Sequence, residues 1–338
     1  MTDAAPYTLH GALASPYSMK MRALLRYRRI AHIWAHGAGA QAATANVKAP
    51  VIPVLEYPDG SFANDSTPLI YDLEQRHQSR SVIPDDAGLA FLAHLIEDFA
   101  DEWLTKAMFG YRWLDQVDQM QMSRWLAFDH FKGGGSTQVE TYAEGFRERQ
   151  VGRMALVGCA PENFPLIEAS TRRLLTAMEK HVVERHYLFG TRPSLAEFAL
   201  FAQLSQLGVD PTPQAMMRAE YPYTYRWLLH IDDASGIEGE WDAPDAPLRS
   251  VVEAFLSEIG LIYGPFLLAN AAAAEAGERT FRFEADGLPY EQGTFRYQLK
   301  CLADLRARYS VLDGAAKARI APVLAKHNCL AFLESSAP

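Results

Sequence analysis

Ser15-Pro16-Tyr17-Ser18 is the stretch of sequence that decides the fold. Residues 7–11 before it are β-prone, and residues 17–25 after it carry an apolar stripe at helical spacing. Pro16 suits the first position of a helix, where its missing N–H is no loss. The Ser15 hydroxyl should then lie beside a helix N-terminus, whose free N–H groups and partial positive charge favour an anion.

Two further motifs follow this tetrapeptide: Val51-Ile52-Pro53-Val54-Leu55, and Asp65-Ser66 at the head of the next apolar periodic run. Residues 31–36 are a strand candidate, and residues 54–57 and 61–64 flank a hairpin turn signal. Strand, helix, strand, hairpin and helix in this order predict a thioredoxin-like half-domain built to hold a small thiol.

With these motifs the chain resembles the glutathione transferase superfamily, and in particular its serine-type, bacterial-like members, over roughly its first two-thirds. The resemblance implies that Ser15 activates the thiol of glutathione, the co-substrate. It implies a cis Pro53 at the mouth of the site and a role for the Ile52 backbone in binding the cysteinyl part. Asp65 and Ser66 would hold the γ-glutamyl end. It also implies a homodimer.

One position departs from the family pattern. Family members often carry Lys or Gln two residues before the cis proline, near the glycine carboxylate of glutathione, and this chain has Val51. Lys48, in the same loop, is the candidate replacement. Serine at both ends of the tetrapeptide excludes the disulfide exchange of glutaredoxins, whose motif begins and ends with cysteine.

Long helical periods begin near residue 87, so the sequence predicts a second, all-helical half. Ser194 followed by Glu197 is a capping box on an apolar helix, similar to the box in the core helix of the transferase C-terminal domain. We expect three regions: a glutathione-binding domain at 6–80, a helical domain at 87–231, and an extension at 232–338 packed on the helical domain.

The first long helix carries an apolar stripe over residues 92–103. His94, Asp98, Asp101 and Glu102 fall toward another face. Such a face is usually solvated, and oxygen-rich metal sites need ligands that converge from several elements. We therefore predict a solvated face and no metal.

Composition narrows the functional classes. The 338 residues carry a net charge of -9, which argues against broad affinity for nucleic acids. Three widely spaced cysteines indicate a reducing compartment, so a cytoplasmic location is expected. The longest apolar run, at 261–274, falls short of the ~20 residues of a membrane span, so no membrane partner is expected.

Two classes of function remain open. The first is a glutathione-dependent transferase that acts on a small electrophile by conjugation, ether cleavage, isomerisation or dehalogenation, with Tyr17 and Trp103 as candidates for the second-substrate pocket. The second is a non-catalytic scaffold or protein-binding module of transferase-like fold. The residues alone also allow simpler roles. Ser15 and Asp65-Ser66 could each do no more than cap a helix, and Pro53 could be an ordinary trans proline.

Overall fold

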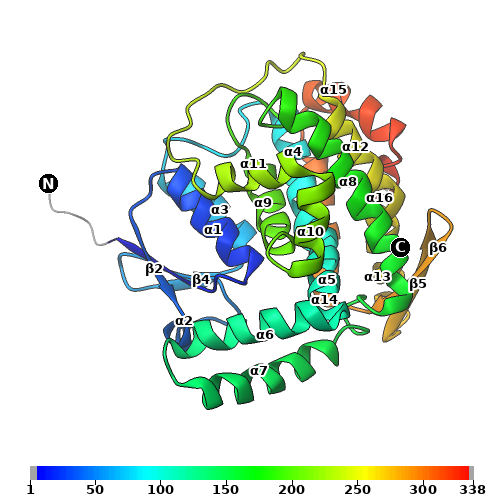
Figure 1. Ribbon diagram of the computed structural model, residues 1–338. Helices are drawn as coiled ribbons and strands as arrows, with labels where there is room; N and C mark the ends of the chain where they lie inside the picture. Colours follow the sequence, from blue (N-terminus) through cyan, green and yellow to red (C-terminus); the bar gives the residue numbers. More distant parts are fainter. Residues whose placement is uncertain (1–5, 335–338) are drawn as a thin grey trace, which may run out of the picture.

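The N-terminal domain folds around a four-stranded sheet in the computed structural model, which describes residues 6–334 (Figure 1). Its strands, in the spatial order β2-β1-β3-β4, are β1 (Tyr7–Gly11), β2 (His32–His36), β3 (Val54–Glu56) and β4 (Phe62–Asn64). The helices of this half are α1 (Pro16–Tyr27), α2 (Ala38–Ala43) and α3 (Ser66–Arg76), with a 3₁₀ turn at Thr44–Asn46. The thioredoxin-like prediction is confirmed.

The register of the sheet brings three loops to one edge. β1 and β3 are antiparallel and pair His10 with Val54, and β3 and β4 are antiparallel and pair Val54 with Asn64. The chain therefore leaves β1 toward Ser15, enters β3 from Pro53 and leaves β4 toward Asp65, all at the same end of three adjacent strands.

The second half is helical, as predicted. Its helices are α4 (Ala87–Phe99), a π-helical turn (Ala100–Leu104), α5 (Thr105–Leu114), α6 (Gln116–Phe131), α7 (Ser136–Val151), a 3₁₀ turn (Pro161–Asn163), α8 (Phe164–Glu184), α9 (Leu195–Leu207), α10 (Pro211–Glu220) and α11 (Pro222–Asp232). Helix α9 is buried along almost its whole length, and its capping box is complete between Ser194 and Glu197. Helices α6 and α7 form a hairpin along the lower side of the molecule, with α2 at one end (Figure 1).

The extension consists of further helices and one β-hairpin. Its elements are α12 (Ser250–Glu258), a π-helical turn (Ile259–Tyr263), α13 (Gly264–Glu275), β5 (Thr280–Ala285), β6 (Leu288–Gly293), α14 (Arg296–Ser310), α15 (Gly314–Lys326) and α16 (Leu330–Leu333). Phe255, Tyr263 and Phe266 are fully buried. The ring centroids of Phe266 and Tyr290 lie 5.8 and 5.2 Å from that of Trp103 in the π-helical turn after α4. The extension therefore shares the hydrophobic core of the helical half.

The apolar run of the extension lies within a longer helix than the sequence indicated. The continuous helix Ser250–Glu275 is long and apolar enough, by length and composition, to cross a membrane. Its most apolar window is 61% buried inside the protein, which is how the core helix of a globular protein behaves.

The prediction of a solvated face on the first long helix is wrong. His94, Asp101 and Glu102 are buried, and Asp98 is half-buried. The reason is that α1 covers this face from one side and the extension from the other, and each of the four polar side chains finds a polar partner there.

Candidate functional site

Ser15 is the N-cap of α1. Its backbone is extended, and its Oγ accepts a hydrogen bond from the Ser18 N–H at 3.3 Å. An N-cap hydroxyl uses a lone pair in this contact and keeps its own hydrogen. Ser15 can therefore cap the helix and still donate a hydrogen bond to an anion at the helix N-terminus.

The loop before Ser15 is held by hydrogen bonds from the helical half of the protein. Arg112 of α5 donates to the Ala14 carbonyl at 2.9 Å, and Gln206 of α9 donates to the Leu13 carbonyl at 2.9 Å. Arg112 is itself paired with buried Asp210 at 2.8 Å. At the sheet end of the loop, a Cβ on Gly11 would lie 2.7 Å from the Ser18 Oγ, so only glycine allows this close approach. The helical half thus fixes the position of Ser15.

The second loop of the site presents free backbone groups. The Ile52-Pro53 peptide bond is cis. Within residues 6–334 the Ile52 N–H and C=O have no hydrogen-bond partner. Val51 is exposed, and so is Lys48 earlier in the loop.

Asp65 stands at the head of α3 in a strained conformation, with φ 77° and ψ 110°. Positive φ at a residue other than glycine is a conformation that functional sites often hold. Its carboxylate does not cap α3, although it occupies the N-cap position. Instead both carboxylate oxygens accept from the hydroxyl of Tyr297 in α14, at 3.1 and 3.0 Å. Ser66, the first residue of α3, is buried.

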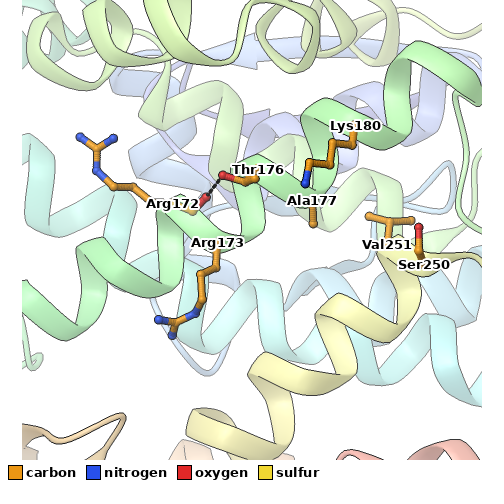
Figure 2. Close-up of a pocket in the computed structure, with 7 residues that line it drawn as sticks. All are labelled: Arg172, Arg173, Thr176, Ala177, Lys180, Ser250 and Val251. Carbon is orange, nitrogen blue, oxygen red and sulfur yellow. Dashed lines mark hydrogen bonds between the residues drawn. The ribbon is translucent and has the colours of Figure 1, made fainter.

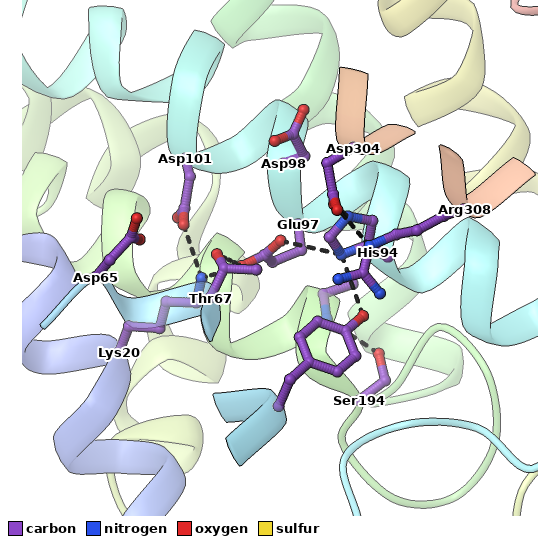
Figure 3. A network of polar contacts seen from close by, with 12 residues as sticks. Lys20, Asp65, Thr67, His94, Glu97, Asp98, Asp101, Ser194, Asp304 and Arg308 are labelled. Carbon is purple, nitrogen blue, oxygen red and sulfur yellow. Dashed lines mark hydrogen bonds and ion pairs between the residues drawn. The ribbon is translucent and has the colours of Figure 1, made fainter. Parts of the chain in front are cut away.

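A network of buried charges lies between α1, α4 and α14 (Figure 3). Lys20 of α1 is completely buried and donates to Glu97, and to Asp101 at 2.7 Å. Glu97 also accepts from Thr67 at 2.5 Å. His94 continues the network, because its Nε2 lies 2.9 Å from Asp304 of α14.

The ionisation of this network follows from burial and from Lys20. Burial raises the pKa of Asp101, and the attraction of Lys20 only partly offsets this effect. Burial acts on Glu97 in the same direction, but Lys20 and His94 outweigh it and lower the pKa of Glu97. Burial lowers the pKa of Lys20, but the carboxylates of Asp101 and Glu97 outweigh this effect and raise it. Lys20 therefore remains a cation.

A second row of polar contacts ties the extension to the same helix. Gln298 of α14 donates to Glu102 at 2.8 Å, and Tyr263 donates to Asp98 at 2.6 Å. Burial raises the pKa of Glu102 and of Asp98. Across residues 6–334, no group of three or more His, Cys, Asp or Glu side chains is arranged to hold a metal ion.

Tyr17 and Trp103, the sequence candidates for a second-substrate pocket, are used in packing. The Tyr17 hydroxyl donates to the Asp101 carbonyl at 2.8 Å. Trp103 is 2% exposed, and its indole N–H donates to Ser170 at 3.1 Å. Tyr17 therefore joins α1 to the π-helical turn after α4, and Trp103 joins this turn to α8.

An apolar pocket of about 500 Å³ opens beside the loop that precedes Ser15. Leu13 and Ala14 of that loop line it together with Met122, Trp125 and Phe128 of α6. A volume of this size suits a small organic molecule. Trp125 and Phe128 are 50% and 65% exposed, so the apolar wall contributed by α6 reaches the surface.

A groove of about 410 Å³ between α8 and α12 has a different character (Figure 2). Arg172, Arg173 and Lys180 line it. Both arginines are already paired with carboxylates: Arg172 with Glu168 and Glu220, and Arg173 with Glu258 and Asp286. Through these ion pairs the two arginines connect α8 to α10 and to α12.

Comparisons with known proteins agree with this architecture. Residues 9–81 match the family model "Glutathione S-transferase, N-terminal domain", and residues 147–230 match "Glutathione S-transferase, C-terminal domain". The fold and the family models thus agree on a thioredoxin-like domain followed by a helical domain. These two ranges carry the N- and C-terminal domain patterns of the glutathione S-transferase superfamily, and the chain has an additional region beyond residue 230.

Solved structures show similarity at low identity. A glutathione S-transferase of Methylobacterium radiotolerans, in complex with glutathione sulfonate, is 17% identical, with 72% of this chain and 99% of that chain covered and a TM-score of 0.41. A glutathione transferase family member of Pseudomonas fluorescens with bound glutathione is 20% identical, covering 67% and 93% at a TM-score of 0.36. The transferase GSTFuA3 of Phanerochaete chrysosporium is 12% identical, covering 70% and 100% at 0.49. A comparison with curated proteins gives no match.

The residues that the extension adds to the candidate site carry no signal in the sequence. Tyr297 on Asp65 and Gln298 on Glu102 lie far along the chain from their partners, and neither belongs to a motif. The apolar period of residues 293–309 indicated a helix, but a helical period does not identify which residues of a distant helix it contacts.

Proposed function

We propose that this protein is a glutathione-dependent transferase in which Ser15 stabilises the thiolate of glutathione. One observation carries the proposal: the sheet register brings the Ser15 loop, the Ile52-Pro53 loop and the start of α3 to one end of adjacent strands. The family models support a glutathione site in this half.

Each part of glutathione has a proposed partner. The free Ile52 N–H and C=O pair with the cysteinyl backbone. Asp65 and Ser66 hold the γ-glutamyl end. Lys48 binds the glycine carboxylate, in place of the Lys or Gln that family members often carry at the position of Val51. We propose further that the protein is cytoplasmic and acts as a homodimer.

The interactions offered by Ser15 and α1 are strong enough to lower the pKa of a bound thiol. Lowering a thiol pKa by about two units corresponds to roughly 2.7 kcal/mol of preference for the thiolate. One hydrogen bond to an anion supplies about 1.5 to 3 kcal/mol, and a helix N-terminus adds about 0.3 to 2 kcal/mol. The Ser15 hydroxyl and α1 together can therefore supply the shift.

We propose that the second substrate, a small electrophile with an apolar part, binds in the pocket lined by Leu13, Ala14 and α6. The thiolate sulfur would attack its electrophilic carbon, a carbon–sulfur bond would form, and the electron pair would pass to a leaving group or an adjacent acceptor atom. Position matters more than ionisation here, because a thiol of lower pKa is also a weaker nucleophile. The class of reaction is conjugation, ether cleavage, isomerisation or dehalogenation.

The test is a titration of bound glutathione by the ultraviolet absorbance of its thiolate. Ser15→Ala should raise the pKa of the bound thiol by about one to two units, because one hydrogen bond to the anion is lost. Ser61→Ala, whose hydroxyl bonds Asp59 in the β3–β4 turn, is the matched control and should leave the pKa unchanged. An unchanged pKa in Ser15→Ala would assign Ser15 to helix capping alone.

A second candidate function is a non-catalytic scaffold. One observation favours it: the carboxylate of Asp65 already accepts a hydrogen bond from Tyr297. Calorimetry with glutathione separates the two candidates, because a scaffold should show no binding at millimolar glutathione.

A further inference from the structure

Tyr297 lies directly in front of the carboxylate of Asp65. Its hydroxyl oxygen lies 3.1 and 3.0 Å from the two carboxylate oxygens, so the hydroxyl sits between them. The proposed function gives this carboxylate to the γ-glutamyl end of glutathione, where the ligand carries its α-ammonium group. An ammonium group that binds the same two oxygens needs the position that the tyrosine hydroxyl occupies.

The extension holds Tyr297 at this place through the start of α14. The Asn270 side chain donates to the Phe295 carbonyl at 3.0 Å and accepts from the Phe295 N–H at 2.9 Å. Gln298, the next residue after Tyr297, is 6% exposed and bonds Glu102. The backbone on either side of Tyr297 is therefore anchored.

The Tyr297 side chain itself reaches the surface of the protein. It is 43% exposed, in contrast to its buried neighbour. A rotation about its side-chain bonds would release Asp65 without opening the core. Because burial and the nearby Asp65 raise the pKa of Tyr297, its hydroxyl remains a donor at neutral pH.

We propose that Tyr297 is a specificity-determining residue of the γ-glutamyl subsite, occupying Asp65 until a ligand with a free α-ammonium group displaces it. This inference rests on the proposed function. An ammonium group can displace the phenol because charge-assisted hydrogen bonds are stronger than those of a neutral donor. A ligand that lacks the ammonium leaves Tyr297 in place and loses the contact with Asp65.

The experiment compares wild type and Tyr297→Phe by calorimetry with two ligands, glutathione and N-acetylglutathione. Tyr297→Phe removes only the hydroxyl that competes for Asp65. Glutathione should bind about tenfold more tightly to the variant, the factor expected when one hydrogen bond to a charge no longer has to be broken. The affinity for N-acetylglutathione should stay within about twofold, because this ligand has no ammonium group to place there.

Two further variants make the comparison specific. Tyr309→Phe is the matched control, since Tyr309 lies on the same helix and its hydroxyl bonds Glu334. It should leave both affinities unchanged. In an Asp65→Asn background, Tyr297→Phe should lose its effect, because the two residues act through one contact. Thermal unfolding of each variant verifies that it is folded.

The outcomes separate this inference from the proposed function. Tighter binding of glutathione by Tyr297→Phe than by wild type, with the affinity for N-acetylglutathione unchanged, supports the inference. Binding by wild type with equal or weaker binding by the variant overturns the inference alone. Absence of binding by both folded proteins overturns the proposed function and the inference together.

Discussion

Lys20 is the cation on which the buried network depends, so its replacement should be severe. Lys20→Met keeps much of the side-chain volume and removes the charge. The variant leaves Glu97 and Asp101 facing each other without their common partner. Breaking a buried ion pair by removing one member destabilises a protein by about 3 to 5 kcal/mol. The matched control is Lys326→Met, whose pair with Glu253 is largely exposed and should be worth at most about 1 kcal/mol.

The loss should also depend on pH. Without Lys20, burial holds the pKa of the two carboxyls above their value of about 4 in the unfolded chain. A raised pKa in the folded state means that these two carboxyls destabilise the folded variant least below pH ~4, and that their unfavourable contribution grows as the pH rises through the raised pKa. Lys20 stays charged across this range in wild type. The difference between wild type and variant should therefore be larger at pH 8 than at pH 5.

Denaturant unfolding at both pH values measures this prediction. Adding Asp101→Asn to Lys20→Met removes one unpaired carboxylate and should recover part of the stability, most clearly at pH 8. A loss below about 1 kcal/mol that does not change with pH would refute the reasoning, because it would mean that water or another cation already solvates the two carboxylates.

Two other predictions follow from the helical half and the extension. Ser194→Ala removes the cap of α9 and leaves the buried Glu197 without one donor, so unfolding in denaturant should show a loss of about 1 to 2 kcal/mol; a change below about 0.3 kcal/mol would contradict it. Truncation after Ile231 removes Tyr263 and Phe266 from Phe99 and Trp103, so size-exclusion chromatography should show aggregation; a soluble, monodisperse and equally heat-stable fragment would make the extension a separate module.

The sheet could be predicted from the sequence because its signals are local. Pro16 beside Ser15, the turn at Pro58-Asp59-Gly60 and the run that begins at Ser66 each identify an element boundary from a few neighbouring residues. Once these boundaries are known, the strand order of the fold brings the three motifs together. The capping box at Ser194 was readable for the same reason, since both of its partners lie within one helical turn.

The environment of α4 could not be predicted, because it depends on partners far along the chain. Charged side chains on one face of a helix are normally solvated, since a buried charge without a partner is unfavourable. Here Asp101 has Lys20 and Glu102 has Gln298, and neither partner belongs to a motif that the sequence displays. The π-helical turn at Ala100–Leu104 also shifts the helical phase, so a regular period assigns the wrong face to the residues beyond it.

Some of the residues beside the proposed glutathione site lie outside the ranges that the family models match. The models match 9–81 and 147–230, which hold Ser15, Pro53, Asp65 and the core helix α9. Part of the apolar wall of the nearby pocket comes from α6, and the hydroxyl on Asp65 comes from α14, both outside the matched ranges. The proposed glutathione site therefore lies within the matched ranges and is bordered by α6 and α14, which lie outside them. Substitutions in α6 and at Tyr297 should accordingly change which ligands bind, whereas substitutions at Ser15 should change the ionisation of the thiol.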